Sequence, residues 1–160
     1  MTSPPSRPGT TNSPAQSLCQ GVPAGSSPTT VQAGSPLQVS ISGEAVHGGG
    51  GCLFSISYDG GNSFTVLSVT DKQCPIQRSF SVQIPANAPN GKAVFAWSWI
   101  PVLSGQPEYY MNCADIVISG GSTGGSIAGP SMPIYNMPGA PTVYAVETKN
   151  FIGLSDIVRL

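Results

Sequence analysis

The only histidine of the chain, His47, stands at the head of a run of four glycines that ends at Cys52. Glycine accepts backbone angles that other residues avoid, so this run can give the neighbouring imidazole an unusual setting. Much further along, Glu108 and Tyr110 stand two residues apart, the spacing at which two side chains share one face of a strand, whereas Tyr109 would face the other way. Imidazole, phenol and carboxylate groups can bind a metal ion or transfer protons. Any chemistry of this chain is therefore expected at these residues.

Each of these residues also has a purely structural interpretation. A histidine followed by glycines can be a turn residue, and Glu108 alone would be a solvated loop carboxylate. Cys52 lies five residues after His47 and could suggest a cysteine nucleophile, although a disulfide is the simpler interpretation. No Ser-His-Asp arrangement can be argued from residue types alone.

The composition excludes several classes of partner. The chain has 160 residues, which suits a single domain, with 8% charged residues and a net charge of −1. This balance argues against binding to nucleic acid or to an anionic membrane surface, which both call for an excess of Lys and Arg. No stretch approaches the roughly 20 apolar residues of a membrane span. A neutral partner such as a polysaccharide fits, and we expect a monomer.

The four cysteines have no C-x-x-C spacing, which argues against a zinc site. In a small chain rich in Ser, Thr and Pro, two disulfides fit better, and they imply an oxidising compartment. The first residues, MTSPPSRP, lack the apolar stretch of a secretory signal peptide. Either the chain is cytosolic with free thiols or its true N-terminus has been lost. We favour loss, and expect an extracellular, secreted protein.

The elements that must position the reactive residues are short strands. Apolar and polar residues alternate in several segments, β-forming residues dominate another, and one is apolar on both faces as a central strand would be. The six expected strand segments are residues 37–41, 52–58, 64–70, 80–84, 93–100 and 112–119. The turn sequence DGGN at residues 59–62 fits a hairpin between two of them. The pattern predicts an all-β protein, an immunoglobulin-like antiparallel β-sandwich.

Composition also suggests boundaries along the chain. Residues 1–16 are mostly Pro, Ser and Thr and are predicted to be a disordered N-terminal segment. The sandwich would span residues 17–120. Residues 121–160 begin as a Gly/Ser linker and continue as a loose C-terminal tail, in which residues 141–146 either add an edge strand or remain loose.

Two motifs stand out in the sequence. The first is GEAVHGGGGC at residues 43–52. The second is the predicted strand AWSWI at residues 96–100, followed by EYYMNCA at residues 108–114. Together they resemble motifs of the fungal lytic polysaccharide monooxygenases of auxiliary activity family eleven, which act on chitin. The motifs occur in the family's order and at a similar separation, and the resemblance covers about residues 17–120. It implies a copper-dependent oxidoreductase that degrades a polysaccharide.

The resemblance also implies a role for each residue. His47 would be a copper ligand, Tyr110 the axial phenol of the catalytic centre, and Ala45 the small residue beside the open axial position. Glu108 would be the second-sphere catalytic carboxylate that orients oxygen species. These types suit the metal, because copper that cycles between Cu(I) and Cu(II) favours imidazole nitrogen, and a weak axial oxygen tunes it. The implied disulfides are Cys52–Cys74 and Cys19–Cys113.

The sequence departs from the family at its N-terminus. There the mature chain begins with a histidine that gives its amine and its ring nitrogen to copper, whereas this sequence begins Met1-Thr2-Ser3. We therefore predict a truncated protein, inactive in this form, that would hold one copper ion only if the missing histidine were supplied. The alternatives are a non-catalytic polysaccharide-binding module and a secreted copper-handling module of the same fold.

Overall fold

The structure, a computed structural model, describes residues 1–70 and 73–144. Within these residues the chain forms a short 3-10 helix, η1 (Leu18–Gly21), and seven strands. The strands are β1 (Thr29–Gln32), β2 (Pro36–Ser40), β3 (Gly50–Ser57), β4 (Thr65–Thr70), β5 (Ser79–Gln83), β6 (Gly91–Pro101) and β7 (Tyr110–Ser119).

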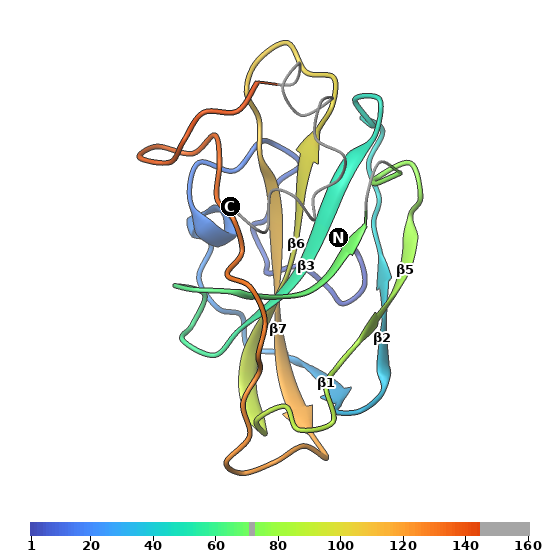
Figure 1. Cartoon of the computed structure of the whole chain (residues 1–160), viewed down its shortest axis with the longest axis vertical. Helices are drawn as coiled ribbons and strands as arrows, with labels where there is room; N and C mark the ends of the chain where they lie inside the picture. Colours follow the sequence, from blue (N-terminus) through green and yellow to red (C-terminus); the bar gives the residue numbers. More distant parts are fainter. Residues whose placement is uncertain (71–72, 145–160) are drawn as a thin grey trace.

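The strands form two sheets that face each other (Figure 1). The larger sheet has the order β1-β7-β6-β3-β4, and β2 pairs with β5 in the smaller one. In the core between them, Phe54 of the larger sheet contacts Phe80 of the smaller sheet with ring centroids 5.0 Å apart. All strand pairs are antiparallel except β1 with β7. This arrangement confirms the predicted all-β, immunoglobulin-like sandwich.

Each of the six predicted segments overlaps one strand, with ends that differ by up to two residues, but β1 is not among them. Its sequence, TTVQ, is too short to show a periodic pattern. The strand forms because it pairs in parallel with the edge of β7, with Val31 opposite Ile118. The formation of β1 therefore depends on a partner strand distant in sequence and not on the local β-propensity of its residues.

Strand β6 is the central strand that its apolar sequence predicts. It pairs with β3 on one side and with β7 on the other. Trp97 and Trp99 face the core between the sheets, whereas Ala96 and Ile100 belong to a second buried cluster on the outer face of the larger sheet. That outer face is buried because Ala15 and Cys19 before β1, and Met132 and Met137 after β7, pack against it.

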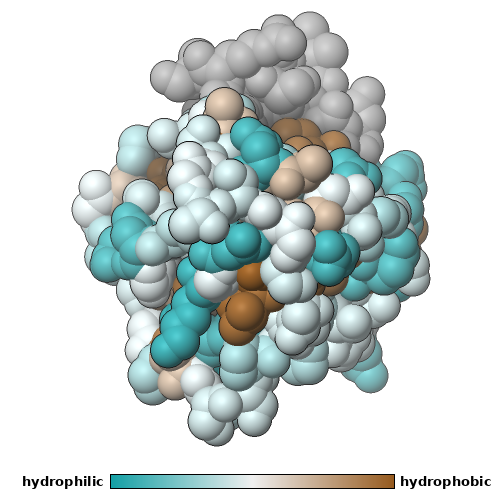
Figure 2. Space-filling view, turned by 90° about the horizontal axis from the view of Figure 1, so that it is seen from below, coloured by the Kyte–Doolittle hydropathy of each residue, from teal (hydrophilic) through white to brown (hydrophobic). Residues whose placement is uncertain are grey.

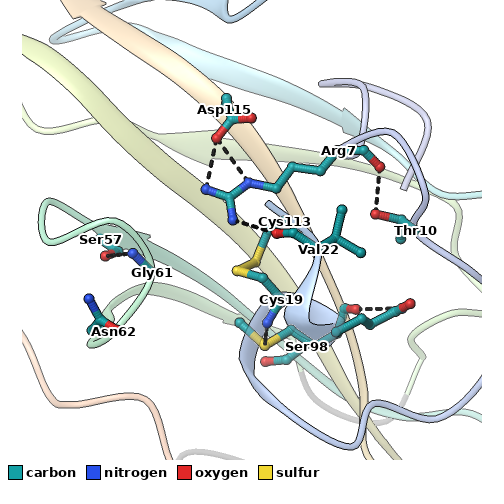
Figure 3. Close-up of a disulfide and its surroundings, with 12 residues drawn as sticks. Arg7, Thr10, Cys19, Val22, Ser57, Gly61, Asn62, Ser98, Cys113 and Asp115 are labelled. Carbon is teal, nitrogen blue, oxygen red and sulfur yellow. Dashed lines mark hydrogen bonds and ion pairs between the residues drawn. A yellow bond between two sulfur atoms is a disulfide. The ribbon is translucent and has the colours of Figure 1, made fainter. Parts of the chain in front are cut away.

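The N-terminal segment is packed, which corrects the prediction that residues 1–16 are disordered. Met1 lies in the core between the sheets with 8% of its surface exposed. Arg7 forms a 2.9 Å ion pair with Asp115 of β7 (Figure 3). Its backbone N–H donates to the Cys113 carbonyl at 2.8 Å. A segment with few apolar residues is held here by backbone hydrogen bonds and a buried charge pair, which composition does not reveal.

The described part of the C-terminal tail is packed as well, which corrects the prediction that it is a loose linker and tail. Met132 and Met137 are buried in the outer cluster. The backbone N–H of Val66 donates to the Pro130 carbonyl at 2.9 Å. Residues 141–144 form no strand, and the rest of the proposed edge strand, residues 145–146, lies outside the described residues.

Both disulfides have the pairing that the resemblance implies. Cys19–Cys113 ties the N-terminal segment at η1 to β7, and Cys52–Cys74 ties β3 to the segment that follows β4. The predicted DGGN turn joins β3 to β4, where the Asp59 carboxylate accepts hydrogen bonds from the Ser57 and Ser63 hydroxyls. These hydrogen bonds hold the pKa of Asp59 below its usual value.

The surface is mixed in character. Seen from the end of the sandwich at the bottom of Figure 1, apolar side chains appear only as small patches between neutral and hydrophilic ones (Figure 2). In the described part of the chain, no helix has the length and apolar character needed to cross a membrane.

Candidate functional site

Two loops meet at one end of the sandwich, the upper end in Figure 1. The loop between β2 and β3 carries His47, and the loop between β6 and β7 carries Glu108. They meet because β6 pairs with both β3 and β7, so the chain leaves β6 at the end where β3 begins. The backbone N–H of Leu103 donates to the His47 carbonyl at 2.8 Å and fixes one loop to the other.

The glycine run gives His47 the unusual backbone that the sequence suggests. His47 has φ of 40°, in the left-handed region, and Gly50 has φ of 139°. A side chain at Gly50 would collide with the backbone oxygen of Ile100 on the neighbouring strand. Glycine at position 50 is therefore required for the loop to approach β6 closely.

Three polar atoms converge where these loops meet. The Nε2 atom of His47 lies 3.3 Å from the hydroxyl of Tyr110 and 3.7 Å from Oε2 of Glu108. The Tyr110 hydroxyl donates to that same carboxylate oxygen at 3.0 Å. The structure thus brings together the three residues that sequence reasoning singled out.

The phenol of Tyr110 stays protonated over the ordinary pH range. Burial raises the pKa of Tyr110 to about 12, and the hydrogen bond and negative charge of Glu108 add to the effect. A neutral phenol can donate its proton to the carboxylate and still offer oxygen lone pairs to a cation.

The ring of Trp99 packs against the His47–Tyr110–Glu108 cluster. From the sequence, Trp99 is interpreted only as a bulky core residue. Its ring stacks on Tyr110 with centroids 4.6 Å apart and on His47 at 5.6 Å. Its indole N–H donates to the Gly49 carbonyl at 3.3 Å. Tyr109, as predicted, lies on the opposite face, where it is fully buried and donates to the Pro133 carbonyl.

A small cavity opens beside the cluster. It has a volume of about 70 Å³, and its lining includes Ala45, Trp99, Tyr110 and Asn112. Ala45 is exposed at its rim. Ala45 and Tyr110 thus line the same cavity, and the role of Ala45 beside an open axial position of the metal stays a prediction.

The amino terminus of the chain lies on the face of β7 that carries Tyr110. The amine of Met1 donates to the side-chain oxygen of Asn112, two residues beyond Tyr110. Residues two apart on a strand are roughly 7 Å apart on one face. Sequence reasoning missed this contact, because a hydrogen bond from the chain's own amine has no sequence signal.

Burial of this amine leads to a prediction about pH. Burial lowers the pKa of the Met1 amine from 8.0 to about 6, so between these values the unfolded state binds more protons than the folded state. The free energy of unfolding should therefore be highest above about pH 8 and fall, by at most about 2 kcal/mol for a partly solvated amine, as the pH drops to about 6. Urea unfolding across this range measures it.

The matched control is a chain extended by one serine before Met1, which replaces the charged amine by an amide. The extended chain should lose this part of the pH dependence. An identical pH dependence in both chains would show that the Met1 amine is not buried.

The described residues offer few donors for a metal ion. Among them, no three His, Cys, Asp or Glu side chains group in a way that could hold a metal ion. His47 and Tyr110 offer one nitrogen and one oxygen, donors of the types that suit copper. The donor types therefore fit copper, but the set is too small for the nitrogen-rich plane that Cu(II) prefers.

Sequence comparison relates the chain to a group of fungal enzymes. It is 46% identical over 90 residues to AA11 family lytic polysaccharide monooxygenase A of Aspergillus fumigatus, a match that covers 56% of this chain and 41% of the relative. It is 30% identical over 113 residues to monooxygenase B of the same species, and 30% identical over 112 residues to an AA11 enzyme of Aspergillus oryzae. These matches confirm the resemblance to fungal AA11 lytic polysaccharide monooxygenases.

The matches cover only part of each relative. The two 30% matches cover 59% of this chain but 27% and 26% of the relatives, so the chain spans about two-fifths or less of the curated relatives it matches. No protein-family model matches the chain.

Solved structures of the same enzyme class share the fold. A cellulose-active polysaccharide monooxygenase from M. thermophila matches with a TM-score of 0.58 and 15% identity, over 71% of this chain and 65% of that one. The enzyme HiLPMO9B matches with a TM-score of 0.62 and 17% identity, over 77% and 69%. At these identities the likeness concerns the sandwich architecture.

Proposed function

We propose that this chain is part of a copper-dependent lytic polysaccharide monooxygenase that acts on chitin or a related polysaccharide. The observation that carries the proposal is the convergence of His47, Tyr110 and Glu108 at one end of the sandwich, in a chain homologous to AA11 enzymes. In the form that begins at Met1, we propose that it is inactive.

The missing copper donors would come from residues that precede Met1. His47 and Tyr110 would hold one side of the ion, and a histidine at the true start of the chain would add its amine and its ring nitrogen. The Met1 amine supports this idea, since it lies beside Asn112 on the face of β7 that also carries Tyr110. A distance of roughly 7 Å along the strand is within the reach of about two extended residues.

Copper, when bound, would supply the oxidation of the C–H bond next to the glycosidic oxygen, with an oxygen co-substrate and an external reductant. The protein residues have separate tasks. Glu108 holds the Tyr110 proton through the 3.0 Å hydrogen bond and orients polar groups beside the metal. Trp99 holds both rings by stacking, and the short side chain of Ala45 leaves space at the rim.

The surroundings of the site suit a neutral, extracellular substrate. The chain carries a net charge of −1, and Leu103 next to the His47 loop has 49% of its surface exposed. Two disulfides and no free cysteine among the described residues fit the oxidising conditions of secretion. We further propose that the protein works as a secreted monomer.

The incomplete donor set leaves room for two alternatives. A module of the same fold could bind polysaccharide without copper, or it could carry copper, with donors besides His47 and Tyr110, without oxidising a substrate. The formation of oxidised products from a polysaccharide would distinguish an enzyme from these alternatives.

The proposed function is tested with chains that begin with a histidine and a short spacer before Met1. Loaded with copper and given a reductant, they should release oxidised oligosaccharides from chitin, detected by mass spectrometry. Glu108→Gln should lower the rate by about 10–100-fold while copper affinity changes little, because the group acts through its neighbours. Glu44→Gln, which changes an exposed carboxylate outside the cluster, serves as the matched control.

Tight copper binding without oxidised products from chitin, cellulose or related glycans would support the copper-handling alternative. Full activity of Glu108→Gln would remove that residue from the proposed site.

A further inference from the structure

Asn136 connects the C-terminal segment to the loop that carries Glu108. Its side-chain NH2 group donates to the Glu108 carbonyl and to the Val143 carbonyl, both at 3.0 Å. Its side-chain oxygen accepts from the Val143 N–H at 2.7 Å. Both ends of the carboxamide are thus used, which makes Asn136 a link between two separate segments.

Glu108 needs such a link because it lies outside the sheet. The pairing of β6 with β7 ends at Trp99 opposite Tyr110, and Glu108 comes two residues before that pair. Its carboxylate must nevertheless stand 3.0 Å from the Tyr110 hydroxyl. The hydrogen bond from Asn136 holds the Glu108 backbone at the distance from which its side chain reaches the phenol.

The backbone of Asn136 is also suited to the task. Its φ is 58°, in the left-handed region that asparagine tolerates better than most residues, and its N–H donates to the Pro141 carbonyl at 2.9 Å. The residue therefore sits at the bend of a closed turn and points its carboxamide at Glu108.

We propose that Asn136 is a positioning residue of the His47–Tyr110–Glu108 cluster. Its side-chain hydrogen bonds go to Glu108 and Val143, so it acts on the cluster by holding Glu108. The C-terminal segment that composition assigns to a loose tail would thus be a part of the site, and its removal would disturb the cluster.

NMR spectroscopy of the chain that begins at Met1 tests this role. Two variants remove the donor group: Asn136→Asp keeps the side-chain shape, and Asn136→Gly keeps the positive φ. In both, cross-peaks between the Glu108 and Tyr110 side chains should weaken strongly. Amide hydrogen exchange of residues 108–110 should become about fivefold faster, as expected for the loss of one hydrogen bond.

Asn87→Ala is the matched control. Asn87 also donates from its side-chain nitrogen to the C-terminal segment, at the Ser126 carbonyl, but far in sequence from the Glu108 contact. This variant should speed exchange near residue 126 and leave residues 108–110 unchanged. A residue that merely ties down the tail would behave in the same way as Asn87.

Unchanged Glu108–Tyr110 cross-peaks in both Asn136 variants would overturn the proposal. If neither variant folds, the proposal can be tested on the unmutated chain. There the Asn136 carboxamide protons should exchange with solvent much more slowly than those of Asn87. Equal exchange rates would contradict the link. The functional importance of Asn136 rests on the proposed function. This NMR experiment uses no copper, so a failure of the proposed copper binding is detected in a separate experiment.

Discussion

Copper titrated into the chain that begins at Met1 should bind with a dissociation constant weaker than about 1 μM, or about −8 kcal/mol. The reason is that His47 and Tyr110 offer only one nitrogen and one oxygen. A chain that starts with histidine, followed by a short spacer before Met1, should bind at least about 1000-fold more tightly, a gain of about 4 kcal/mol. Isothermal titration calorimetry measures both.

The length of the spacer gives this prediction a geometric test. Because the Met1 amine contacts Asn112, roughly 7 Å along β7 from Tyr110, a spacer of about two residues should bind best. His47→Ala should return the best binder to the weak affinity of the chain that begins at Met1, whereas a serine-first chain of equal length should never bind tightly. Sub-micromolar binding by the chain that begins at Met1, or an affinity independent of the spacer, would contradict the proposed donor set.

Loss of the Cys19–Cys113 disulfide should cost more stability than any other single change that we consider. The bond joins residues 94 apart, so the entropy of closing its loop corresponds to about 4–5 kcal/mol. The double variant Cys19→Ala/Cys113→Ala should therefore show a much lower urea midpoint. The N-terminal segment, which this bond ties to β7, should become sensitive to proteases first.

The second disulfide provides the comparison. Cys52–Cys74 joins residues only 22 apart, and its removal should cost about 3 kcal/mol. The comparison between the two losses of stability is more informative than either value alone, because each double variant replaces two cysteines by alanines. A smaller loss for the Cys19 pair would show that other contacts, such as the Arg7–Asp115 ion pair, suffice to hold the N-terminal segment.

Much of the fold follows from sequence because the strands carry alternating side chains. The burial of β6 on both faces is a consequence of that periodicity. The strand spacing also predicts that Glu108 and Tyr110 point the same way, although Glu108 precedes the first residue of β7. The disulfide pairing could be predicted only through the resemblance to a family, since four cysteines allow three pairings.

The parts that sequence reasoning missed are held by interactions without periodicity. The Met1 amine on Asn112, the Asn136 carboxamide on the Glu108 carbonyl and the parallel pairing of β1 are all contacts between distant segments. A backbone carbonyl has the same chemistry in every residue, so the sequence does not identify which one a side chain will meet. Composition therefore described both ends of the chain as loose although they cover the sheet.

The packing of the N-terminal segment and of residues 121–144 against the larger sheet has a consequence for biosynthesis. The contacts around the site join residues far apart in sequence: Met1 and Asn112 are separated by 111 positions, and Asn136 and Glu108 by 28. Such long-range contacts form slowly, because chain entropy is lost before they are rewarded. While the ribosome is still making residues 110–144, the N-terminal segment has no strand β7 to bind. The site end of the sandwich is therefore expected to assemble only once residues up to 144 have been made, when the earlier hairpins have already formed.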